Sequence, residues 1–468
     1  MRLKIRENIK MDSKIFVYNT ATRKKEELKT IKPNFVGIYS CGPTVYSSPH
    51  IGNMYAYVCW DVLVRTLEFL GYEVHQVINV TDVGHLVADS DDGEDKMEKG
   101  SKAEGLSAWD LAKKYENEFV GNLDKLNIKR PWKMPRATDH IKEQIELIQL
   151  IEKNAFTYQI SDGIYFDTGK FSGYGDFAKL NMEKLKEGAS LETNPEKKNQ
   201  ADFALWKFSP KDGTKRQMEW ESPWGIGFPG WHIECTAMST KYLGNPFDIH
   251  TGGEDHIAIH HTNEIAQAFG AWGKQTANYW MHNAFITFKG AKISKSSGGL
   301  YTVMDLEKMG YDALDYRYLV LGSHYRKGME FSEENLKAAK TARLKLNELA
   351  KGVVGTIDEG WMNKFREKIS DDLAMPEALA TIWIMWKSQM KIENKIATLL
   401  EMDKVLGLNL GKKVAEEIVP QEIKDLAQKR AEAKTNKDWN KADELRDLIK
   451  EKGFVLEDGK DGVKIHKI

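Results

Sequence analysis

Residues 35–80 read FVGIYSCGPTVYSSPHIGNMYAYVCWDVLVRTLEFLGYEVHQVINV, and the first structural inference comes from this segment. Its apolar start, 35–40, runs into Cys-Gly-Pro, which indicates a buried strand followed by a turn. Over 54–72 the apolar residues recur with helical spacing, and Gly71 lies where such a helix would end. A strand pattern returns over 73–84. This order predicts a βαβ unit with parallel strands and a right-handed crossover.

A second unit of the same kind follows much later in the chain. PFDIHTGGED (246–255) reads as a strand and a glycine turn, 256–273 as a helix, and NYWMHNAFIT (278–287) as a strand. Two such units predict an α/β fold with a doubly wound, Rossmann-like parallel sheet. In such sheets ligands bind at the carboxyl ends of the strands, and SCGPTVYSSPHIGN (40–53) lies at that edge.

The order of patterns divides the chain into three predicted domains. Residues 1–301 are predicted to form the α/β domain, with an insertion at about 131–227. Amphipathic helices with charged outer faces predict an all-helical region over 302–415 and a small domain over 416–468. The charge-rich segment 90–105 is predicted to be a solvated loop or a helix cap.

Composition restricts the class of protein. The 468 residues are 41% hydrophobic and 29% charged, which favours a globular chain with enough apolar residues for a core. The net charge of −1 requires any site for a polyanion to be a local patch. The N-terminus has no apolar core segment and no run of 18 apolar residues occurs, so we expect neither secretion nor a membrane span. Three cysteines cannot form a disulfide framework, which favours a cytoplasmic chain with thiol or metal chemistry.

Two loops have the chemistry of a phosphate site. His50 and Gly52 lie at the predicted start of a helix, whose unpaired N–H groups and dipole favour phosphate. In the loop KGAKISKSSGG, Lys292 and Lys295 are three apart, with Ser294 and Ser296 interleaved and glycines on both sides. Taken alone, such a histidine is more often a cap, and such a lysine pair more often a solvated loop. Together they predict a triphosphate site in which charge is stabilised as pyrophosphate leaves.

HIGN and KISKS resemble the HIGH and KMSKS signatures of class I aminoacyl-tRNA synthetases. Each departs by one residue, with Asn53 in place of the final histidine and Ile293 in place of methionine. The resemblance extends over nearly the whole chain, and within the class it is to the cysteinyl-tRNA synthetases. Its longest segments are TVYSSPHIGN, GYEVHQVINVTDVGH, SPWGIGFPGWHIECTAMS, DIHTGGEDHIAIHHTNEIAQ and DWNKADELRDLIKEKGFVLEDG.

Four residues are candidates for a metal site. His260 and Glu264 are four apart on a predicted helix and can present an imidazole and a carboxylate to one point. Taken alone, such a pair more often lies on a surface, and a buried cysteine usually packs. The family's zinc ligands lie in CGPTVY, GWHIEC and HHxNE, which implies one zinc ion per chain held by Cys41, Cys235, His260 and Glu264. Cys59, on the apolar helix, is predicted to be a packing thiol.

The resemblance also implies a reaction and its partners. L-cysteine would be activated by ATP with Mg²⁺ and transferred to tRNA(Cys) by a cytoplasmic monomer, and zinc would select the cysteine thiol over the serine hydroxyl. The implied ATP site contains His50, Gly52, Asn53, Gly252, Gly253, Asp255, Lys292, Ser294 and Lys295, of which His50, Asn53, Lys292 and Lys295 are catalytic. The implied cysteine pocket contains Cys41, Thr44 and Trp231.

The small C-terminal domain is implied to read the anticodon. Its matching residues are Trp439, Asp443 and Asp458, and an exposed aromatic ring with nearby acceptors suits unstacked RNA bases. From the residues alone, a helix that packs Trp439 into a core is as good an interpretation.

Two other functions remain open at this point. The first is an enzyme of the same fold that joins cysteine to a small amine, as in the mycothiol-pathway ligase that resembles this family. An anticodon-reading domain argues against it, because a small acceptor needs none. The second is a non-catalytic RNA-binding protein with a structural zinc ion, which would have no need of His50, Lys292 and Lys295.

Overall fold

The structure is a computed structural model. It describes residues 14–83, 96–180, 194–210, 216–288, 291–292, 300–411, 420–436, 438–459 and 462–467.

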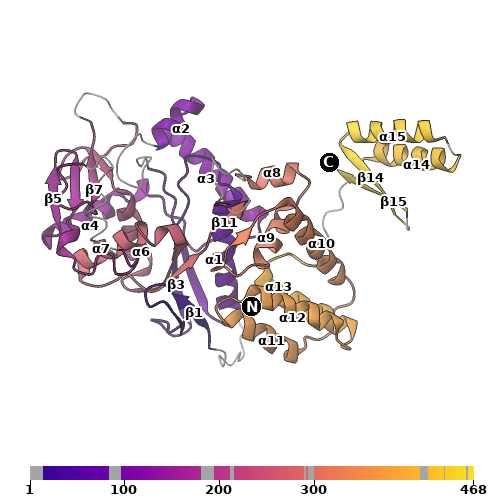
Figure 1. Cartoon of the computed structure of the whole chain (residues 1–468), viewed down its shortest axis with the longest axis horizontal. Helices are drawn as coiled ribbons and strands as arrows, with labels where there is room; N and C mark the ends of the chain where they lie inside the picture. The colour runs from indigo at the N-terminus through magenta and orange to yellow at the C-terminus, as the bar shows by residue number, and fades with distance from the viewer. Residues whose placement is uncertain are drawn as a thin grey trace, which may run out of the picture.

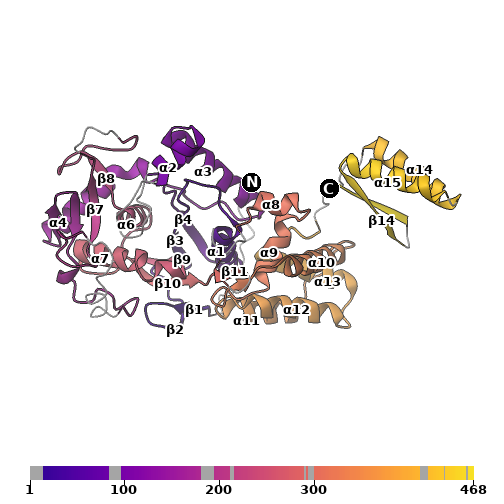
Figure 2. The ribbon, with the colours of Figure 1, turned by 45° about the horizontal axis from the view of Figure 1, so that its top comes forward.

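A four-stranded parallel sheet forms the centre of the molecule (Figures 1 and 2). Its spatial order is β10-β9-β3-β4, so that the two βαβ units meet at β9 and β3. The strands are β3 (Phe35–Ser40), β4 (Glu73–Ile78), β9 (Phe247–Gly253) and β10 (Ala277–Asn283). This confirms the predicted Rossmann-like α/β fold. The apolar runs of β3 and β9 are almost wholly buried, as expected for strands covered on both faces.

Three helices belong to these units: α1 (Ile51–Phe69), α6 (Trp231–Leu243) and α7 (His260–Trp272). Helix α1 ends at the predicted place, where Gly71 takes a φ of +97° that a residue with a side chain rarely adopts. Cys59 lies buried on α1 within the apolar core, which confirms that it packs. A two-stranded hairpin, β1 (Phe16–Asn19) and β2 (Lys24–Glu27), lies beside β10, where the backbone N–H of Thr20 donates to the carbonyl of Trp280.

The chain between β4 and β9 carries a separate antiparallel sheet of order β5-β6-β7-β8 (Figure 2). Its strands are β5 (Thr157–Ile160), β6 (Gly163–Phe166), β7 (Phe203–Phe208) and β8 (Gly227–Pro229), and α4 (Ile141–Lys153) packs with them in one apolar core. Before it come α2 (Lys96–Glu104) and α3 (Ala108–Lys125). Part of the segment predicted as a loop or helix cap is therefore helical. Met97 is buried against Leu111 and its neighbours, and this contact outweighs the dense charge.

Helices dominate the region after the last strand of the central sheet. They are α8 (Val303–Lys308), α9 (Ala313–Leu321), α10 (Glu333–Leu349), α11 (Glu359–Ser370), α12 (Met375–Lys387) and α13 (Ile392–Leu406). Three short strands accompany them, namely β11 (Ile286–Phe288), β12 (Ala291–Lys292) and β13 (Met329–Glu330). A buried charge cluster joins this region to α1: Asp61 accepts hydrogen bonds from Arg65 and Arg317, and Arg317 also donates to the carbonyl of Leu406.

The C-terminal unit stands apart from the main body in Figure 1. It consists of α14 (Gln421–Thr435), α15 (Trp439–Glu451), β14 (Phe454–Gly459) and β15 (Gly462–Lys467). The helices and the hairpin enclose an apolar core of their own, formed by Ile423, Ala427, Ile449 and Phe454. Among the described residues, no helix combines the length and the apolar character needed to cross a lipid bilayer.

Asp82, just after β4, is a buried carboxyl group whose ionisation affects the stability of the fold. Burial raises the pKa of its carboxyl from 3.8 to about 6, although the N–H and hydroxyl of Thr138 both donate to it. Folding therefore favours the protonated acid, and its cost to stability is fully present above about pH 6 and absent below the unfolded-state pKa. This cost is at most about 3 kcal/mol.

Asp82→Asn removes the charge and keeps both contacts: its carbonyl oxygen can accept from the Thr138 N–H, and its NH2 group can donate to the Thr138 hydroxyl oxygen, which reverses that hydrogen bond. We expect it to raise the free energy of unfolding near neutral pH, by up to about 3 kcal/mol, and to change it little near pH 4. Urea unfolding of both proteins at the two pH values measures the difference. An equal change at both values would contradict the assignment to ionisation.

Candidate functional site

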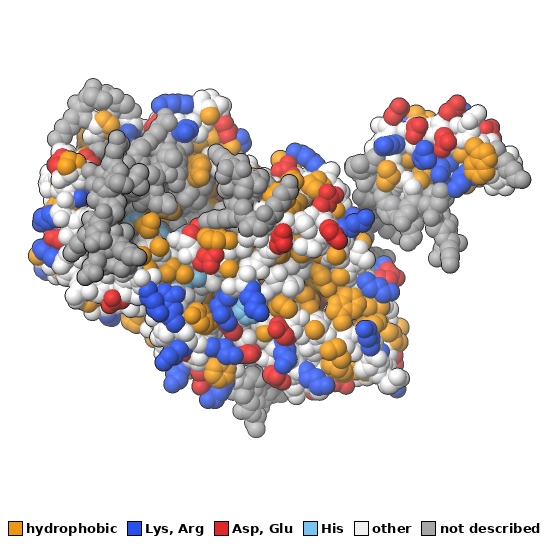
Figure 3. Space-filling model, in the orientation of Figure 1, with side chains coloured by type: hydrophobic (Ala, Val, Ile, Leu, Met, Phe, Trp, Pro, Cys, Tyr) orange, Lys and Arg blue, Asp and Glu red, His pale blue; other side chains and the backbone are white. Residues whose placement is uncertain are grey.

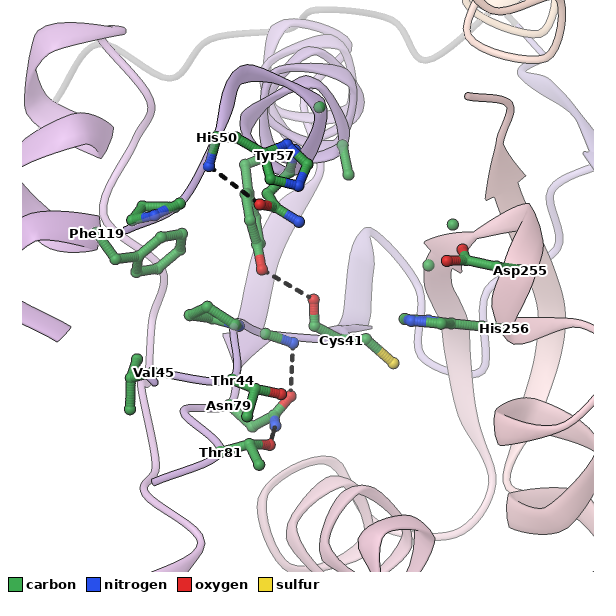
Figure 4. Close-up of a pocket in the computed structure, with 18 of the residues that line it drawn as sticks. Cys41, Thr44, Val45, His50, Tyr57, Asn79, Thr81, Phe119, Asp255 and His256 are labelled. Carbon is green, nitrogen blue, oxygen red and sulfur yellow. Dashed lines mark hydrogen bonds between the residues drawn. The ribbon is translucent and has the colours of Figure 1, made fainter. Parts of the chain in front are cut away.

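A cavity of about 410 Å³ opens at the carboxyl ends of β3, β4 and β9, where the sequence places the ligand site (Figure 4). Its walls come from the segment 41–60, the end of β4, the start of α6 and the turn after β9. The predicted residues that line it are Cys41, Thr44, His50, Gly52, Asn53, Trp231, Cys235, Gly252, Gly253, Asp255 and His260. The structure therefore brings the residues of five separated motifs to one cavity.

His50 and Asn53 form a reciprocal cap, a capping box, at the N-terminus of α1. The side chain of His50 accepts from the backbone N–H of Asn53, and the Asn53 side chain accepts from the backbone N–H of His50 (Figure 4). This reciprocal cap gives Asn53 a structural role that the sequence did not reveal. It also fixes the His50 ring at the positive end of the α1 dipole, where an anion is stabilised.

Two glycine turns let the backbone approach closely. A Cβ atom on Gly42 would lie 1.5 Å from the carbonyl oxygen of Asn79, so no side chain fits there. On the opposite wall, a Cβ on Gly252 would lie 2.7 Å from the rings of His256 and His261. Both turns therefore need glycine, because the neighbouring backbone and rings pack directly against them.

Hydrogen bonds hold the Cys41 loop in position (Figure 4). The N–H of Gly42 donates to the side-chain oxygen of Asn79, whose amide donates to Thr81, and the Thr81 hydroxyl donates to Glu234. On the other side, the Tyr57 hydroxyl donates to the Cys41 carbonyl. Because Glu234 precedes Cys235, one buried chain of bonds connects the neighbours of the two thiols. Sequence reasoning missed Asn79, Thr81 and Tyr57, which only the fold brings beside the motifs.

The four predicted metal ligands lie together at the wall of the cavity, which Cys41, Cys235 and His260 line, whereas Glu264 is buried beside them and does not line it. One donor atom from each of Cys41, Cys235, His260 and Glu264 lies within 4.8 Å of every other. His260 Nε2 is 3.1 Å from Glu264 Oε1, yet that buried oxygen forms no hydrogen bond among the residues described. A cation between these atoms would satisfy it. Two sulfurs, an imidazole and a carboxylate form a donor set that suits zinc.

The thiol of Cys41 is protonated in the metal-free chain. Burial, and then the neighbouring Cys235, raise the pKa of the Cys41 thiol well above its usual value. Metal ligation requires the thiolate, so metal binding at this cluster releases protons and weakens as the pH falls.

More histidines surround the cluster. His232 Nδ1 lies 2.9 Å from His260 Nδ1, an outer contact of the kind that orients a metal-ligating ring. His261 Nε2 lies 3.2 Å from Cys41 Sγ, and its Nδ1 lies 2.7 Å from His282 Nε2. Burial, followed by repulsion from neighbouring imidazoles, lowers the pKa of His261 and His282 well below the usual value. Both rings are therefore neutral at physiological pH.

The remaining predicted residues lie elsewhere or outside the described chain. Lys292 belongs to β12, which pairs with β11 beside the cavity residue Ile286, and its side chain is not described. Ser294 and Lys295 lie outside the described residues. In the C-terminal unit, Asp443 is exposed on α15 and Asp458 lies on β14.

Trp439, at the start of α15, is 59% exposed. This excludes the interpretation in which it packs into a core. On the face shown in Figure 3, the C-terminal unit carries acidic side chains along its outer edge and basic ones towards its middle.

Comparisons with known proteins show the family of this chain. The family "tRNA synthetases class I (C) catalytic domain" matches residues 27–341. The chain is similar to cysteine--tRNA ligase 1 of Burkholderia lata, with 46% identity over 96% of each chain. It is similar to the cysteine--tRNA ligase of Treponema denticola, with 43% identity over 94% of this chain and 97% of that one.

Among solved structures, it resembles Mycobacterium tuberculosis methionyl-tRNA synthetase bound by methionyl-adenylate. The TM-score is 0.54 at 15% identity, over 80% of this chain and 90% of that chain, which supports the fold.

Proposed function

Because the chain belongs to the cysteine--tRNA ligases, a family of class I tRNA synthetases, we propose that its central cavity holds ATP and L-cysteine side by side. The family's reaction activates cysteine with ATP and transfers it to tRNA. One observation carries the proposal: the Cys41, Cys235, His260 and Glu264 cluster opens into the same cavity as the His50 cap. Metal and phosphate sites that share a cavity suit a thiol amino acid whose carboxylate must reach a phosphate.

The cluster is the zinc site of this proposal, with one ion per chain. A bound zinc ion supplies a borderline-soft Lewis acid that prefers a thiolate to a hydroxyl, which separates cysteine from serine. Cys41, Cys235, His260 and Glu264 hold it, while Trp231 and Thr44 line the cysteine pocket between the cluster and the phosphate side. The outer contact from His232 keeps the His260 ring turned toward the cluster.

The phosphate side of the cavity positions ATP. His50 and Asn53, at the positive end of the α1 dipole, contact its phosphates, and Mg²⁺ accompanies the nucleotide. Gly252, Gly253 and Asp255 line the adenosine side of the cavity. The cysteine carboxylate attacks the α-phosphate in line and pyrophosphate leaves, with its growing charge met by Lys292 and Lys295.

The second step transfers the cysteinyl group from the adenylate to a hydroxyl of the 3′-terminal ribose, and AMP leaves. Positioning and charge stabilisation suffice for both steps, with no covalent intermediate on the enzyme. The C-terminal unit reads the anticodon through Trp439, Asp443 and Asp458.

Pyrophosphate exchange with each amino acid in turn, followed by charging of total tRNA, tests the proposal. We expect exchange with cysteine and none with serine, and charging of a single tRNA acceptor. Exchange without charging, with a small amine accepted in place of tRNA, would instead favour the ligase alternative. The alignment of the relatives over 94–96% of this chain already argues against that alternative.

Lys295→Ala should slow adenylate formation by about 100-fold and change the affinity for cysteine little. The charge of Lys295 is needed most as pyrophosphate departs, so its loss appears in the rate constant rather than in ground-state binding. Single-turnover pyrophosphate exchange at varied cysteine concentration separates the two quantities. A loss of cysteine affinity at an unchanged rate constant would overturn the placement of this loop over the phosphates.

Trp439→Ala should weaken tRNA binding by about 1–3 kcal/mol, the usual value for a base stacked on an aromatic ring. The exposed ring at the start of α15 is free to stack, and its removal leaves the apolar core of the unit intact. Filter binding of tRNA(Cys) measures the loss, and Trp439→Phe, which keeps an aromatic face, serves as the control. Unchanged binding by a folded Trp439→Ala variant would remove Trp439 from the anticodon site.

A further inference from the structure

Two of the three cysteines lie beside each other in the metal cluster and line the cavity. Cys41 follows β3 and Cys235 lies on α6, 194 positions later in the chain. Their sulfur atoms lie within 4.8 Å of each other, and both residues belong to the cavity wall. They also pack in one apolar cluster, which includes Tyr39 and Met238. The fold therefore holds two thiols close together at a wall that a small molecule can reach.

The two thiols differ in how far they are exposed. Cys235 is 2% exposed, whereas Cys41 is partly exposed on the loop after β3. Figure 4 shows the Cys41 sulfur turned toward the side of the cavity that carries His256. A small polar reagent that enters the cavity therefore meets the sulfur of Cys41 before that of Cys235.

A short movement of the two side chains would bring the sulfur atoms to bonding distance. The sulfurs of a disulfide lie about 2.0 Å apart, so this pair must close by less than about 3 Å. Because both sulfurs are donor atoms of the cluster, they approach each other through the space that a metal ion fills. A disulfide and a bound ion therefore exclude each other, and only His260 and Glu264 remain as ligands once the disulfide has formed.

We propose that Cys41 and Cys235 are a peroxide-sensitive thiol pair, whose oxidation to a disulfide expels the metal ion from the cluster. The inference rests on the zinc site of the proposed function, to which it adds a reversible loss of the ion. Hydroperoxides are the oxidant class, because they react with thiolates and the smallest of them, hydrogen peroxide, fits easily into a cavity of about 410 Å³.

The oxidation proceeds in two balanced steps. As metal ligands both sulfurs are thiolates, the form that attacks peroxide. The Cys41 thiolate attacks one oxygen of hydrogen peroxide, so that an S–O bond forms, the O–O bond breaks and hydroxide leaves. The Cys235 thiolate then attacks the sulfenic acid sulfur of Cys41, so that the S–S bond forms, the S–O bond breaks and a second hydroxide leaves. The two thiolates lose two electrons in total, and the peroxide takes both.

Oxidation of the thiols one by one is the competing explanation for a loss of metal. A thiol without a close partner passes from the sulfenic to the sulfinic acid, which added thiols do not reduce. A neighbouring thiolate intercepts the sulfenic acid and keeps the change reversible. Cys59 provides an internal reference for this difference, because it is buried in the core on α1.

Treatment of the zinc-loaded full-length chain with hydrogen peroxide decides between the two explanations. Zinc content and cysteine-dependent pyrophosphate exchange are measured first on the untreated sample. Zinc release is then followed with a coloured chelator against a sample without peroxide, and the thiols are alkylated in denaturant and mapped by mass spectrometry. We expect one equivalent of zinc to leave for each Cys41–Cys235 disulfide that forms, with Cys59 still alkylated. Dithiothreitol followed by added zinc should restore both the thiols and the metal content.

Several outcomes would contradict the proposal. Zinc loss with Cys41 as a sulfinic acid and Cys235 alkylated would overturn it, and so would a disulfide that leaves the zinc in place. Absence of the disulfide from a sample that held zinc and exchanged pyrophosphate before treatment would overturn this inference and leave the proposed function standing. An untreated sample that holds no zinc would overturn both.

Cys59→Ser is the matched control variant. It removes the third thiol of the chain and leaves the pair at the cavity unchanged. We expect the same disulfide and the same one equivalent of released zinc as in the unmodified chain. Loss of the zinc release in this variant would show that Cys59 takes part in the oxidation, and the assignment to Cys41 and Cys235 would fail.

Discussion

Cys235→Ser is expected to abolish metal binding and cysteine-dependent pyrophosphate exchange together. Serine offers a hydroxyl of high pKa where the cluster needs a soft anionic ligand, and the site is left with one thiolate. Changes in the outer shell of a metal site already cost about 10–100-fold in affinity, and a direct ligand costs more. Metal content after dialysis and the rate of exchange are the two measurements, and both should fall to the level of a sample without enzyme.

Cys59→Ser is the matched control for this variant. Cys59 is also a buried thiol, but it packs in the core on α1 and is not a member of the metal cluster. We expect it to keep its metal and its exchange activity, with some loss of stability from the buried hydroxyl. Retention of metal by Cys235→Ser would instead show that Cys41, His260 and Glu264 suffice to hold it.

Cobalt substitution tests whether the metal meets the substrate. Adding cysteine should produce a new sulfur-to-cobalt charge-transfer band, and adding serine should produce none. The cysteine sulfur would join Cys41, Cys235 and His260 as a donor to the metal, beside the Glu264 carboxylate or in its place, because that carboxylate would be the weakest donor of the set. An unchanged spectrum during active exchange would make the ion structural, and selection against serine would then need a different explanation.

The sequence was sufficient to predict those parts of the fold that depend on local patterns of residues. Apolar runs of strand length, a helical period and Gly71 predicted the βαβ units and the end of α1, and the structure confirms them. The charged segment that contains α2 was misjudged because Met97 packs against α3, a long-range contact that no local pattern shows.

In the site, too, local patterns were predicted from the sequence and long-range contacts were not. Residues alone placed His260 and Glu264 on one helical face, but Cys41 and Cys235 are 194 positions apart, and only the family resemblance joined them. The capping role of Asn53 was hidden because histidine is an unusual N-cap. His261 and His282 carried no signal, since a buried histidine on a helix or strand looks in sequence like any satisfied core residue.

Removing the residues after Gly411 is expected to leave cysteine-dependent exchange nearly intact while aminoacylation collapses. The cut must not fall earlier: Leu406, Leu408 and Leu410 are buried in the helical region, and Asp403 accepts from the backbone N–H groups of Leu408 and Leu410. A break near residue 400 would expose this core and remove the Leu406 carbonyl from Arg317. Truncation after Gly411 removes the C-terminal unit with the residues that precede it, and spares the packing that supports α1.

The size of the loss follows from what the C-terminal unit would contribute. Each anticodon base held by stacking is worth about 1–3 kcal/mol, so losing several lowers charging by about 1,000-fold or more. The cavity and the metal cluster lie wholly before the cut, and the apolar core of the removed unit is its own, so adenylate formation has no reason to change. Exchange and charging of tRNA(Cys) by the same truncated sample give the comparison, with Trp439→Ala as an intermediate case. An equal loss of both activities in a sample that keeps its metal would show that the C-terminal unit supports the catalytic fold. The assignment of adenylate formation to the main body and of tRNA recognition to the C-terminal unit would then be wrong.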